Sequence, residues 1–160
     1  MKIEEKTIEP FLNTSLISIE GEIWKDIYDY EGIYQISSFG RVKSLNRFTS
    51  IGRKIKERIL KQYFVGCKQL VVTLAVDGGK YKMYVTQLVG SCFIGYTKKN
   101  EVYTHLDSDK CNNNISNISI KTKSDQVKLS YKNGILKDWG IKEAGIKTRF
   151  IKKITYENKL

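Results

Sequence analysis

The sequence lacks any long apolar run. The longest, Leu70–Val76, has seven residues and includes Thr73, whereas a membrane-spanning helix needs about 20 apolar residues. Residues 1–10 carry three acidic side chains and no apolar segment, so we expect no secretory signal peptide and no membrane partner. The 160 residues are 41% hydrophobic and 28% charged, which is typical of a globular domain with one core.

Cysteine is scarce, and several nucleotide and metal motifs are missing. The three cysteines, at 67, 92 and 111, have no Cys-x-x-Cys spacing, which predicts free thiols in a reducing compartment and no zinc site. Neither G-x-x-x-x-G-K-[ST] nor G-x-G-x-x-G occurs, so we expect no nucleotide cofactor. A calcium loop starting at Asp107 would need Gly at position six and Glu at position twelve, where the chain has Asn112 and Ile118.

Positive charge is in excess. Lys and Arg number 28 against 17 Asp and Glu, a net charge of +11 with a pI near 9.5. Residues 41–68 hold nine basic residues and one acidic, and residues 121–160 hold 11 basic and four acidic, whereas residues 1–32 have a net charge of −5. Two basic blocks favour a polyanionic partner, because each Lys or Arg on a phosphate releases counterions. A solvated lysine-rich surface would have the same composition.

Hydrophobic periodicity predicts an α+β fold. A turn at 37–40 between Tyr34–Ile36 and Val42 predicts a hairpin, with Arg41 and Lys43 sharing the face opposite Val42. Further along, the patterns predict strands at 69–76 and 80–85, a short helix at 87–93, two strands within 101–120, a helix between the Thr122–Asp125 capping box and Gly134, and helix in the tail.

The one histidine, His105, lies in an asparagine-rich stretch, residues 104–117. A strand, a polar loop, a return strand and a capped helix form a ββα unit, in which a histidine near the first strand can face the helix and take a proton from water. Oxygen ligands from the loop and helix would hold a hard divalent ion on a phosphate. The same residues also fit a surface loop in which the asparagines only form turns.

Two stretches resemble known nuclease motifs. Residues 105–117, continued by Ser-Asp-Gln at 124–126 and Tyr-Lys-Asn-Gly at 131–134, resemble the His-Asn-His (HNH) homing endonucleases of phages and group I introns. Residues 22–45, with Trp-Lys-Asp-Ile at 24–27, Tyr-Glu-Gly at 30–32 and Gly-Arg-Val-Lys-Ser-Leu at 40–45, resemble the nuclease-associated modular DNA-binding motif that often precedes that domain. Together they cover most of residues 22–134, in the family's order.

The resemblance implies an endonuclease that hydrolyses a DNA phosphodiester with one divalent metal, Mg²⁺ or Mn²⁺. His105 falls on the general base and Asn117 on the central asparagine that braces it. Thr104 stands where the family often has an Asp or Asn metal ligand, and Gln126 where its helix supplies an asparagine ligand, with Asp107 as a further candidate. Thr86 stands where a histidine often opens the preceding segment. A threonine hydroxyl is a poorer ligand than a carboxylate for these ions.

The resemblance also gives the basic residues a role. It implies double-stranded DNA as the partner, contacted by Arg41, Lys43, Arg47, Arg53, Lys54, Lys56 and Arg58. It implies an N-terminal antiparallel sheet module (1–68), a ββα nuclease region (69–136) and a basic helical tail (137–160), in a phage-encoded protein acting in the cytoplasm of a bacterial host. The alternatives are a catalytically degenerate relative that binds DNA, or a host or phage protein, as a regulator, and a general basic RNA-binding domain.

Overall fold

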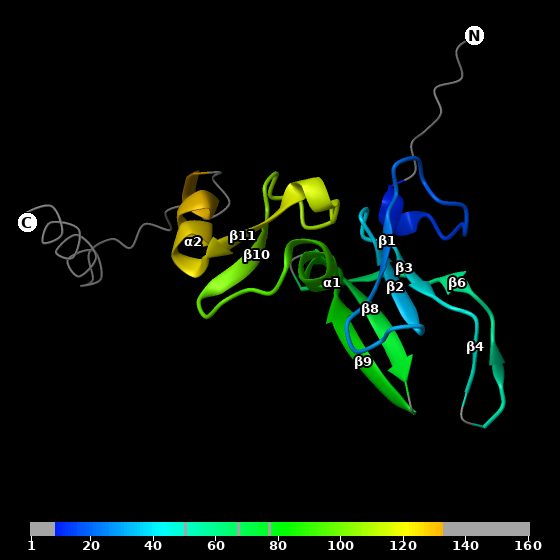
Figure 1. Ribbon diagram of the computed structural model, residues 1–160. Coiled ribbons are helices and arrows are strands. Elements are labelled where there is room, and N and C mark those ends of the chain that lie inside the picture. The colour runs from blue at the N-terminus through cyan, green and yellow to red at the C-terminus, as the bar shows by residue number, and fades with distance from the viewer. Residues whose placement is uncertain (1–8, 50, 67, 77, 133–160) are drawn as a thin grey trace, which may run out of the picture. The chain divides into compact units, whose positions relative to one another are not determined.

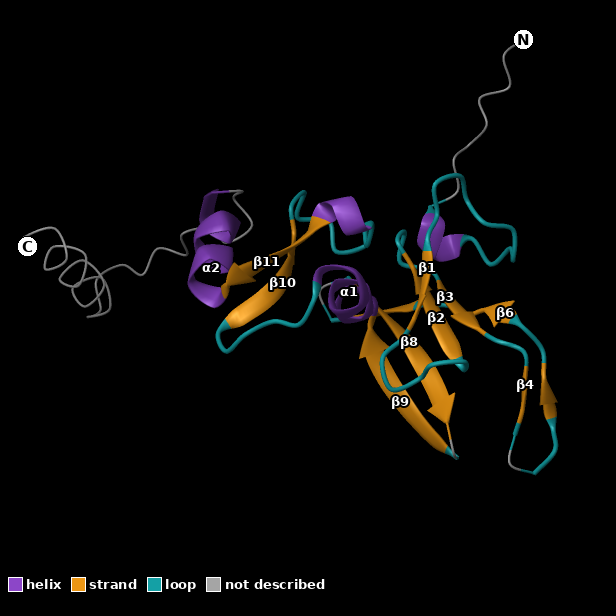
Figure 2. Cartoon of the chain, viewed as in Figure 1, coloured by secondary structure: helices purple, strands orange, loops and turns teal. Residues whose placement is uncertain are grey.

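The computed structural model describes residues 9–49, 51–66, 68–76 and 78–132 (Figure 1). Strands predominate and helices are few and short (Figure 2). The elements in chain order are η1 (Pro10–Leu12), β1 (Trp24–Asp26), β2 (Tyr34–Ser37), β3 (Val42–Ser44), β4 (Arg47–Phe48), β5 (Lys54–Ile55), β6 (Arg58–Ile59), β7 (Tyr63–Val65), β8 (Gln69–Val76), β9 (Gly79–Tyr84), α1 (Val85–Val89), η2 (a π-helical turn, Gly90–Ile94), β10 (Glu101–His105), η3 (Ile115–Asn117), β11 (Ile118–Thr122) and α2 (Lys123–Lys132).

The first sheet has the strand order β1-β2-β3-β6, and its strands are antiparallel. The predicted hairpin around the turn at 37–40 is confirmed: β2 and β3 form it, Ile36 pairs with Val42, and both are buried. The turn between them closes with Gly40 N–H donating to Ser37 O at 2.9 Å. Gly40 has φ +82°, a left-handed conformation that glycine adopts without strain.

The second sheet has the order β7-β8-β9 and supplies much of the core. Leu70, Val72 and Leu74 on β8 are at most 1% exposed and join the apolar face of the first sheet in one cluster. The Tyr34 hydroxyl links the two sheets, because it donates to Ala75 O and accepts from Ala75 N–H, both at 3.0 Å. The predicted strands at 69–76 and 80–85 are confirmed, with β9 one residue earlier.

A short helical segment carries the chain from β9 toward β10. Val85, Leu88 and Val89 of α1 are buried in the core, and the helix lies at the end of the β8–β9 hairpin (Figure 1). Gly90 allows Tyr103 of β10 to pack closely, since a Cβ there would lie 2.4 Å from the tyrosine ring. The Tyr103 hydroxyl donates to Gly95 O at 2.6 Å. These contacts hold the strand that ends at His105 against the helical segment.

The β10–β11 hairpin pairs His105 with Ile118 and Thr104 with Ser119. The chain divides into two compact units, residues 1–123 and 124–160, and α2 begins at their boundary. The α+β class and the antiparallel sheets are confirmed. The predicted boundaries after residues 68 and 136 stay predictions, and the tail helix and Gly134 lie outside the described residues. No helix in the described ranges is long and apolar enough to span a bilayer.

Candidate functional site

The loop after His105 is held by Asn117, which is only 8% exposed. Asn117 Nδ2 donates to Asp107 Oδ1 at 2.9 Å and to Asn112 O at 2.8 Å, while its Oδ1 accepts from Asp107 N–H at 3.1 Å. One buried amide therefore ties the start of the loop to its end. These bonds hold the loop that follows His105, and the bracing of His105 itself by Asn117 stays a prediction.

Asp107 faces the interior of the same loop. Its Oδ1 accepts from Asp109 N–H at 2.8 Å as well as from Asn117, and its Oδ2 accepts from Asn112 Nδ2 at 2.7 Å. Burial raises the pKa of Asp107, but the hydrogen bonds from Asn117 and Asn112 outweigh it and hold the pKa below its ordinary value. Asp107 is thus an ionised loop brace near neutral pH.

The His105 ring lies against two side chains that the sequence reasoning did not assign to the site. Its Nε2 is 3.2 Å from Asn113 Oδ1 and 3.4 Å from Thr86 Oγ1. Burial lowers the pKa of His105, and the hydrogen bond with Asn113 offsets only part of that effect. The imidazole is therefore neutral near neutral pH, as a general base requires. The signal for Asn113 was the Asn-Asn-Asn run, which by itself indicates turns.

The described residues do not fit a divalent metal ion by themselves. Thr104 Oγ1 is buried without a hydrogen-bond partner among the described residues, but a single neutral hydroxyl is a weak ligand for Mg²⁺ or Mn²⁺. Both carboxylate oxygens of Asp107 accept hydrogen bonds within its own loop. Across the described ranges, no three His, Cys, Asp or Glu side chains converge. Gln126 lies on α2 in the second unit, and its role stays a prediction.

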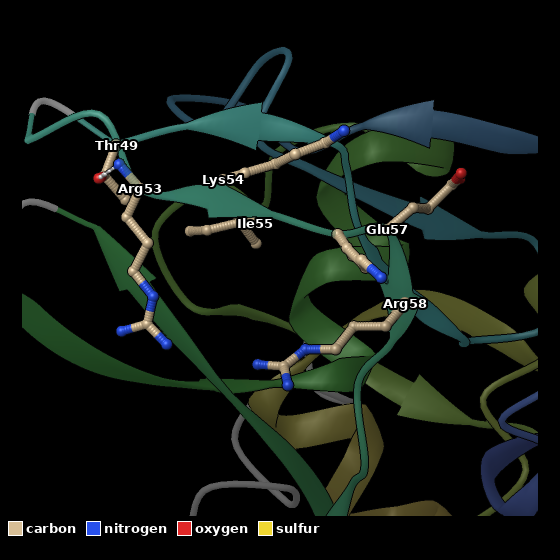
Figure 3. Close-up of a pocket in the computed structure, with 7 residues that line it drawn as sticks. Thr49, Arg53, Lys54, Ile55, Glu57 and Arg58 are labelled. Carbon is tan, nitrogen blue, oxygen red and sulfur yellow. Dashed lines mark hydrogen bonds between the residues drawn. The ribbon is translucent and has the colours of Figure 1, made fainter.

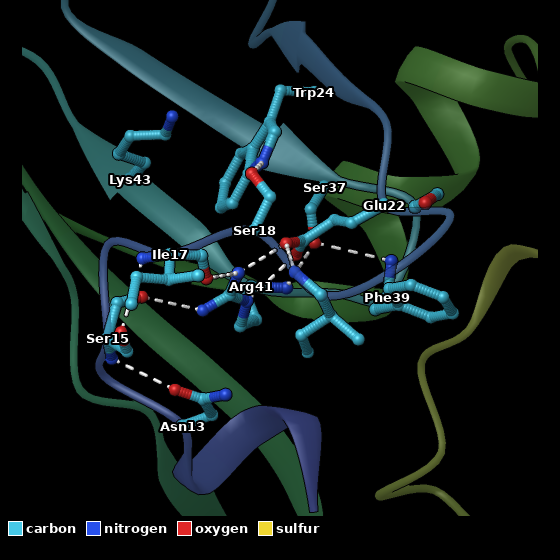
Figure 4. Close-up of polar contacts among 12 residues, drawn as sticks. Asn13, Ser15, Ile17, Ser18, Glu22, Trp24, Ser37, Phe39, Arg41 and Lys43 are labelled. Carbon is cyan, nitrogen blue, oxygen red and sulfur yellow. Dashed lines mark hydrogen bonds and ion pairs between the residues drawn. The ribbon is translucent and has the colours of Figure 1, made fainter.

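Arg41 is inside the protein, which corrects its predicted place on DNA. Its side chain is 0% exposed and pairs with Glu22 through two hydrogen bonds. It also donates to Ser15 O at 2.7 Å and to Ile17 O at 3.0 Å (Figure 4). These four hydrogen bonds engage all three nitrogens of the buried guanidinium, so Arg41 holds the segment before β1 on the sheet and is not available to DNA.

The side chains of Arg47 and Lys43 also make contacts within the protein. Arg47 donates to Ile33 O, Ser44 Oγ, Leu45 O and the Tyr34 hydroxyl at 2.9–3.3 Å. The Lys43 side chain is 14% exposed, and its Nζ lies 4.2 Å from the centre of the Trp24 ring and 3.6 Å from Glu57 Oε1. Lys43 and Arg41 both lie over Trp24, which confirms that they share a face. Arg47, like Arg41, has mainly structural contacts.

The other four predicted DNA-binding residues are exposed together. Around Gly52 the chain forms the short β4–β5 hairpin, with Phe48 paired to Lys54. An open pocket of about 420 Å³ follows this hairpin into β6 (Figure 3). Phe48 and Ile51 at the hairpin end are 70% and 86% exposed. The pocket is lined by Thr49, Arg53, Lys54, Ile55, Lys56, Glu57 and Arg58. The β4–β5 hairpin together with the exposed basic residues Arg53, Lys54, Lys56 and Arg58 is called the basic hairpin below. It has the charge and the exposure that phosphate contacts require.

Three comparisons place these features beside known proteins. The NUMOD4 motif matches residues 22–73, the segment from Glu22 into the middle of β8. The DNA endonuclease I-HmuI of Bacillus phage SP01 is 32% identical over 114 residues, which are 71% of this chain and 60% of that relative. A solved structure showing DNA binding and cleavage by the HNH homing endonuclease I-HmuI superposes with a TM-score of 0.59 at 29% identity, covering 84% of this chain and 68% of that one. The chain thus spans about 60% of the length of the curated relative.

Proposed function

We propose that this chain, which carries a NUMOD4 motif and is homologous to a phage HNH homing endonuclease, is a DNA endonuclease that uses His105 as its general base. One observation supports the role of His105 above the others. The single histidine of the chain ends β10 with its Nε2 engaged by Asn113 and its pKa lowered by burial. A neutral, oriented imidazole is the group that removes a proton from water near neutral pH.

The chemistry is the hydrolysis of a phosphodiester. The His105 ring takes a proton from a water molecule, the resulting hydroxide oxygen bonds to phosphorus, and the opposite P–O bond breaks. The departing oxygen takes a proton from solvent. HNH endonucleases generally use a divalent metal ion, but the described residues give it no complete ligand set.

The basic hairpin supports double-stranded DNA as the substrate. Four basic side chains are exposed and line one open pocket: Arg53, Lys54, Lys56 and Arg58. They follow Arg41 and Arg47, whose side chains are engaged within the protein, in the sequence. Phosphate contacts from such residues set position along the duplex, while few side chains read bases. We expect the protein to act inside a bacterial cell, as the phage relative suggests.

The poor metal-binding capacity of Thr104 and Asp107 favours a second function, in which the chain binds without cleaving. Thr104 offers only a neutral hydroxyl at the position where the family often has an Asp or Asn, and Asp107 is engaged within its loop. A chain without a working metal site would still present the basic hairpin. It would then act as a catalytically degenerate relative that binds DNA, or a host or phage protein, as a regulator.

A nicking assay separates the two functions. Supercoiled plasmid carrying AT-rich phage DNA is incubated with the full chain or with His105→Ala, in Mg²⁺ or Mn²⁺. If the chain is an endonuclease with His105 as its base, we expect metal-dependent nicking whose rate falls by about 10²–10⁴-fold in the variant. The absence of nicking by the full chain, together with salt-sensitive retention of DNA by both proteins in a gel-shift assay, would establish the DNA-binding regulator instead.

A further inference from the structure

Both groups beside Nε2 of His105 are oxygen atoms. Asn113 Oδ1 lies 3.2 Å away and Thr86 Oγ1 lies 3.4 Å away. These two oxygens also bond to each other, with the Thr86 hydroxyl donating to Asn113 Oδ1 at 2.7 Å. The Thr86 proton is therefore directed at Asn113, and only lone pairs of Thr86 face the imidazole.

The orientation of the Asn113 amide follows from its other contacts. Asn113 Nδ2 donates to Lys110 O at 3.3 Å and to Cys111 O at 3.4 Å. A flipped amide would place its oxygen against these two carbonyl oxygens and leave the amide nitrogen facing Thr86 and His105. Because the observed orientation gives both ends of the amide a partner, the atom that faces His105 is the carbonyl oxygen.

An amide oxygen accepts hydrogen bonds and never donates one. We infer that Asn113 is a positioning residue: its amide oxygen accepts the Nε2 proton of His105 and leaves Nδ1 as the unprotonated nitrogen that takes the proton from water. No hydrogen bond among the described residues reaches Nδ1, and Nδ1 is not among the buried atoms without a partner. The catalytic meaning of this tautomer rests on the proposed function, whereas the tautomer itself does not.

Two other elements of the fold hold Asn113 in place. Asn113 is 3% exposed, and Thr86 on α1 fixes its oxygen. On another side, a Cβ at Gly40 would lie 2.7 Å from Asn113 Cβ, so the β2–β3 turn touches it directly. The same turn accepts Ile115 N–H through Ser38 O at 2.8 Å. The turn within the NUMOD4 segment thus supports the residue that sets the state of His105.

The single histidine makes the tautomer directly measurable. The full chain is labelled with ¹⁵N-histidine, and long-range ¹H–¹⁵N spectra are recorded at about pH 8.5, roughly two units above the ordinary histidine pKa. The inference predicts one protonated nitrogen, Nε2, and one unprotonated nitrogen, Nδ1, without averaging between them. A proton on Nδ1, or an averaged pair of nitrogen signals, would overturn it.

Substitution then tests whether Asn113 is responsible. In Asn113→Ala the two nitrogen signals should move toward each other as the tautomers exchange, whereas Asn114→Ala, which removes a cap of η3 and no contact to the ring, should leave them unchanged. A folded Asn113→Ala with wild-type nitrogen signals would overturn the role. If that variant does not fold, Asn113→Asp keeps the size and an acceptor oxygen, and it should retain the proton on Nε2; a proton on Nδ1 there would overturn the role.

This readout is independent of cleavage. A chain that shows the Nε2–H tautomer but cleaves no DNA supports the positioning by Asn113 and rejects the proposed function. A chain that cleaves DNA while carrying the proton on Nδ1 keeps the proposed function and rejects the positioning.

Discussion

Arg41 and Glu22 form an ion pair in which neither side chain is exposed to solvent. Burial raises the pKa of Glu22, but the hydrogen bonds from Arg41, Ile19 N–H and Ser37 together with the Arg41 charge outweigh it, so the pKa lies below its ordinary value and the pair is ionised. Two further N–H groups of Arg41 donate to Ser15 O and Ile17 O. The pair therefore anchors the segment before β1 to the sheet that carries the β2–β3 turn.

Replacing Arg41 should destabilise the protein rather than weaken its binding to DNA. Arg41→Ala leaves the Glu22 carboxylate buried without its partner, a change that costs about 3–5 kcal/mol in comparable pairs. Denaturant unfolding of the variant should show this decrease in the free energy of unfolding. Arg53→Ala, at an exposed position, is the control and should change stability by less than about 0.5 kcal/mol. A stable Arg41→Ala that no longer binds DNA would show that Arg41 contacts DNA after all.

The sequence was informative where the signal is local. The alternation around Val42 correctly placed Arg41 and Lys43 on one face, because side-chain direction follows the strand period of two. The exposure of that face was not predictable from the period. It depends on residues 13–22, which show no regular pattern and fold over Arg41 through backbone carbonyls. A carbonyl acceptor leaves no trace in the side-chain sequence.

In the candidate site, too, the contacts between residues close in the chain were predictable and the long-range contacts were not. The polar stretch after His105 predicted a strand, a loop and a return strand, since these depend on residues close in the chain. The contact with Thr86 joins residues 19 apart, and the contact with Gly40 joins two segments of the chain that only the packed core brings together. Those contacts required the structure.

The basic hairpin should set the salt dependence of DNA binding. Arg53→Ala and Arg58→Ala should each weaken binding and reduce the slope of log affinity against log salt by about 0.9 for each phosphate that the variant no longer neutralises. Titrations at several salt concentrations measure this slope. Lys99→Ala, an exposed lysine outside the hairpin, should leave the slope unchanged. Equal slopes for all the variants would place the DNA interface elsewhere.

Cleavage should persist to a lower pH than an exposed histidine would allow. Burial lowers the pKa of His105, so the neutral, proton-accepting form survives as the pH falls below the ordinary value of about 6.5. The acid limb of kcat/KM against pH, which reports the free enzyme, should have its midpoint below that value. The lowered pKa also stabilises the fold above the unfolded-state pKa, and this stabilisation is lost as the pH falls through the folded-state value. A midpoint above the ordinary value would contradict the burial of the ring.

Gly40→Ala should disturb the His105 site, and Gly52→Ala should not. Both glycines have positive φ, +82° and +76°, so an alanine meets a similar backbone cost of about 1–2 kcal/mol at either position. Only at Gly40 would the added Cβ reach Asn113, at 2.7 Å, whereas Gly52 has nothing within 4 Å. The histidine ¹⁵N signals should therefore shift in Gly40→Ala and stay in place in Gly52→Ala. The same response in both variants would mean that the turn does not support Asn113.

The most direct test of the account is chemical rescue of the base. His105→Gly removes the imidazole and opens space at the end of β10, so added imidazole can take the place of the ring. The account predicts that His105→Gly binds DNA, fails to nick it, and regains nicking in proportion to the concentration of neutral imidazole. A variant that binds DNA and nicks it at the full rate without imidazole, or one that no concentration of imidazole rescues, would contradict the assignment of His105 as the general base.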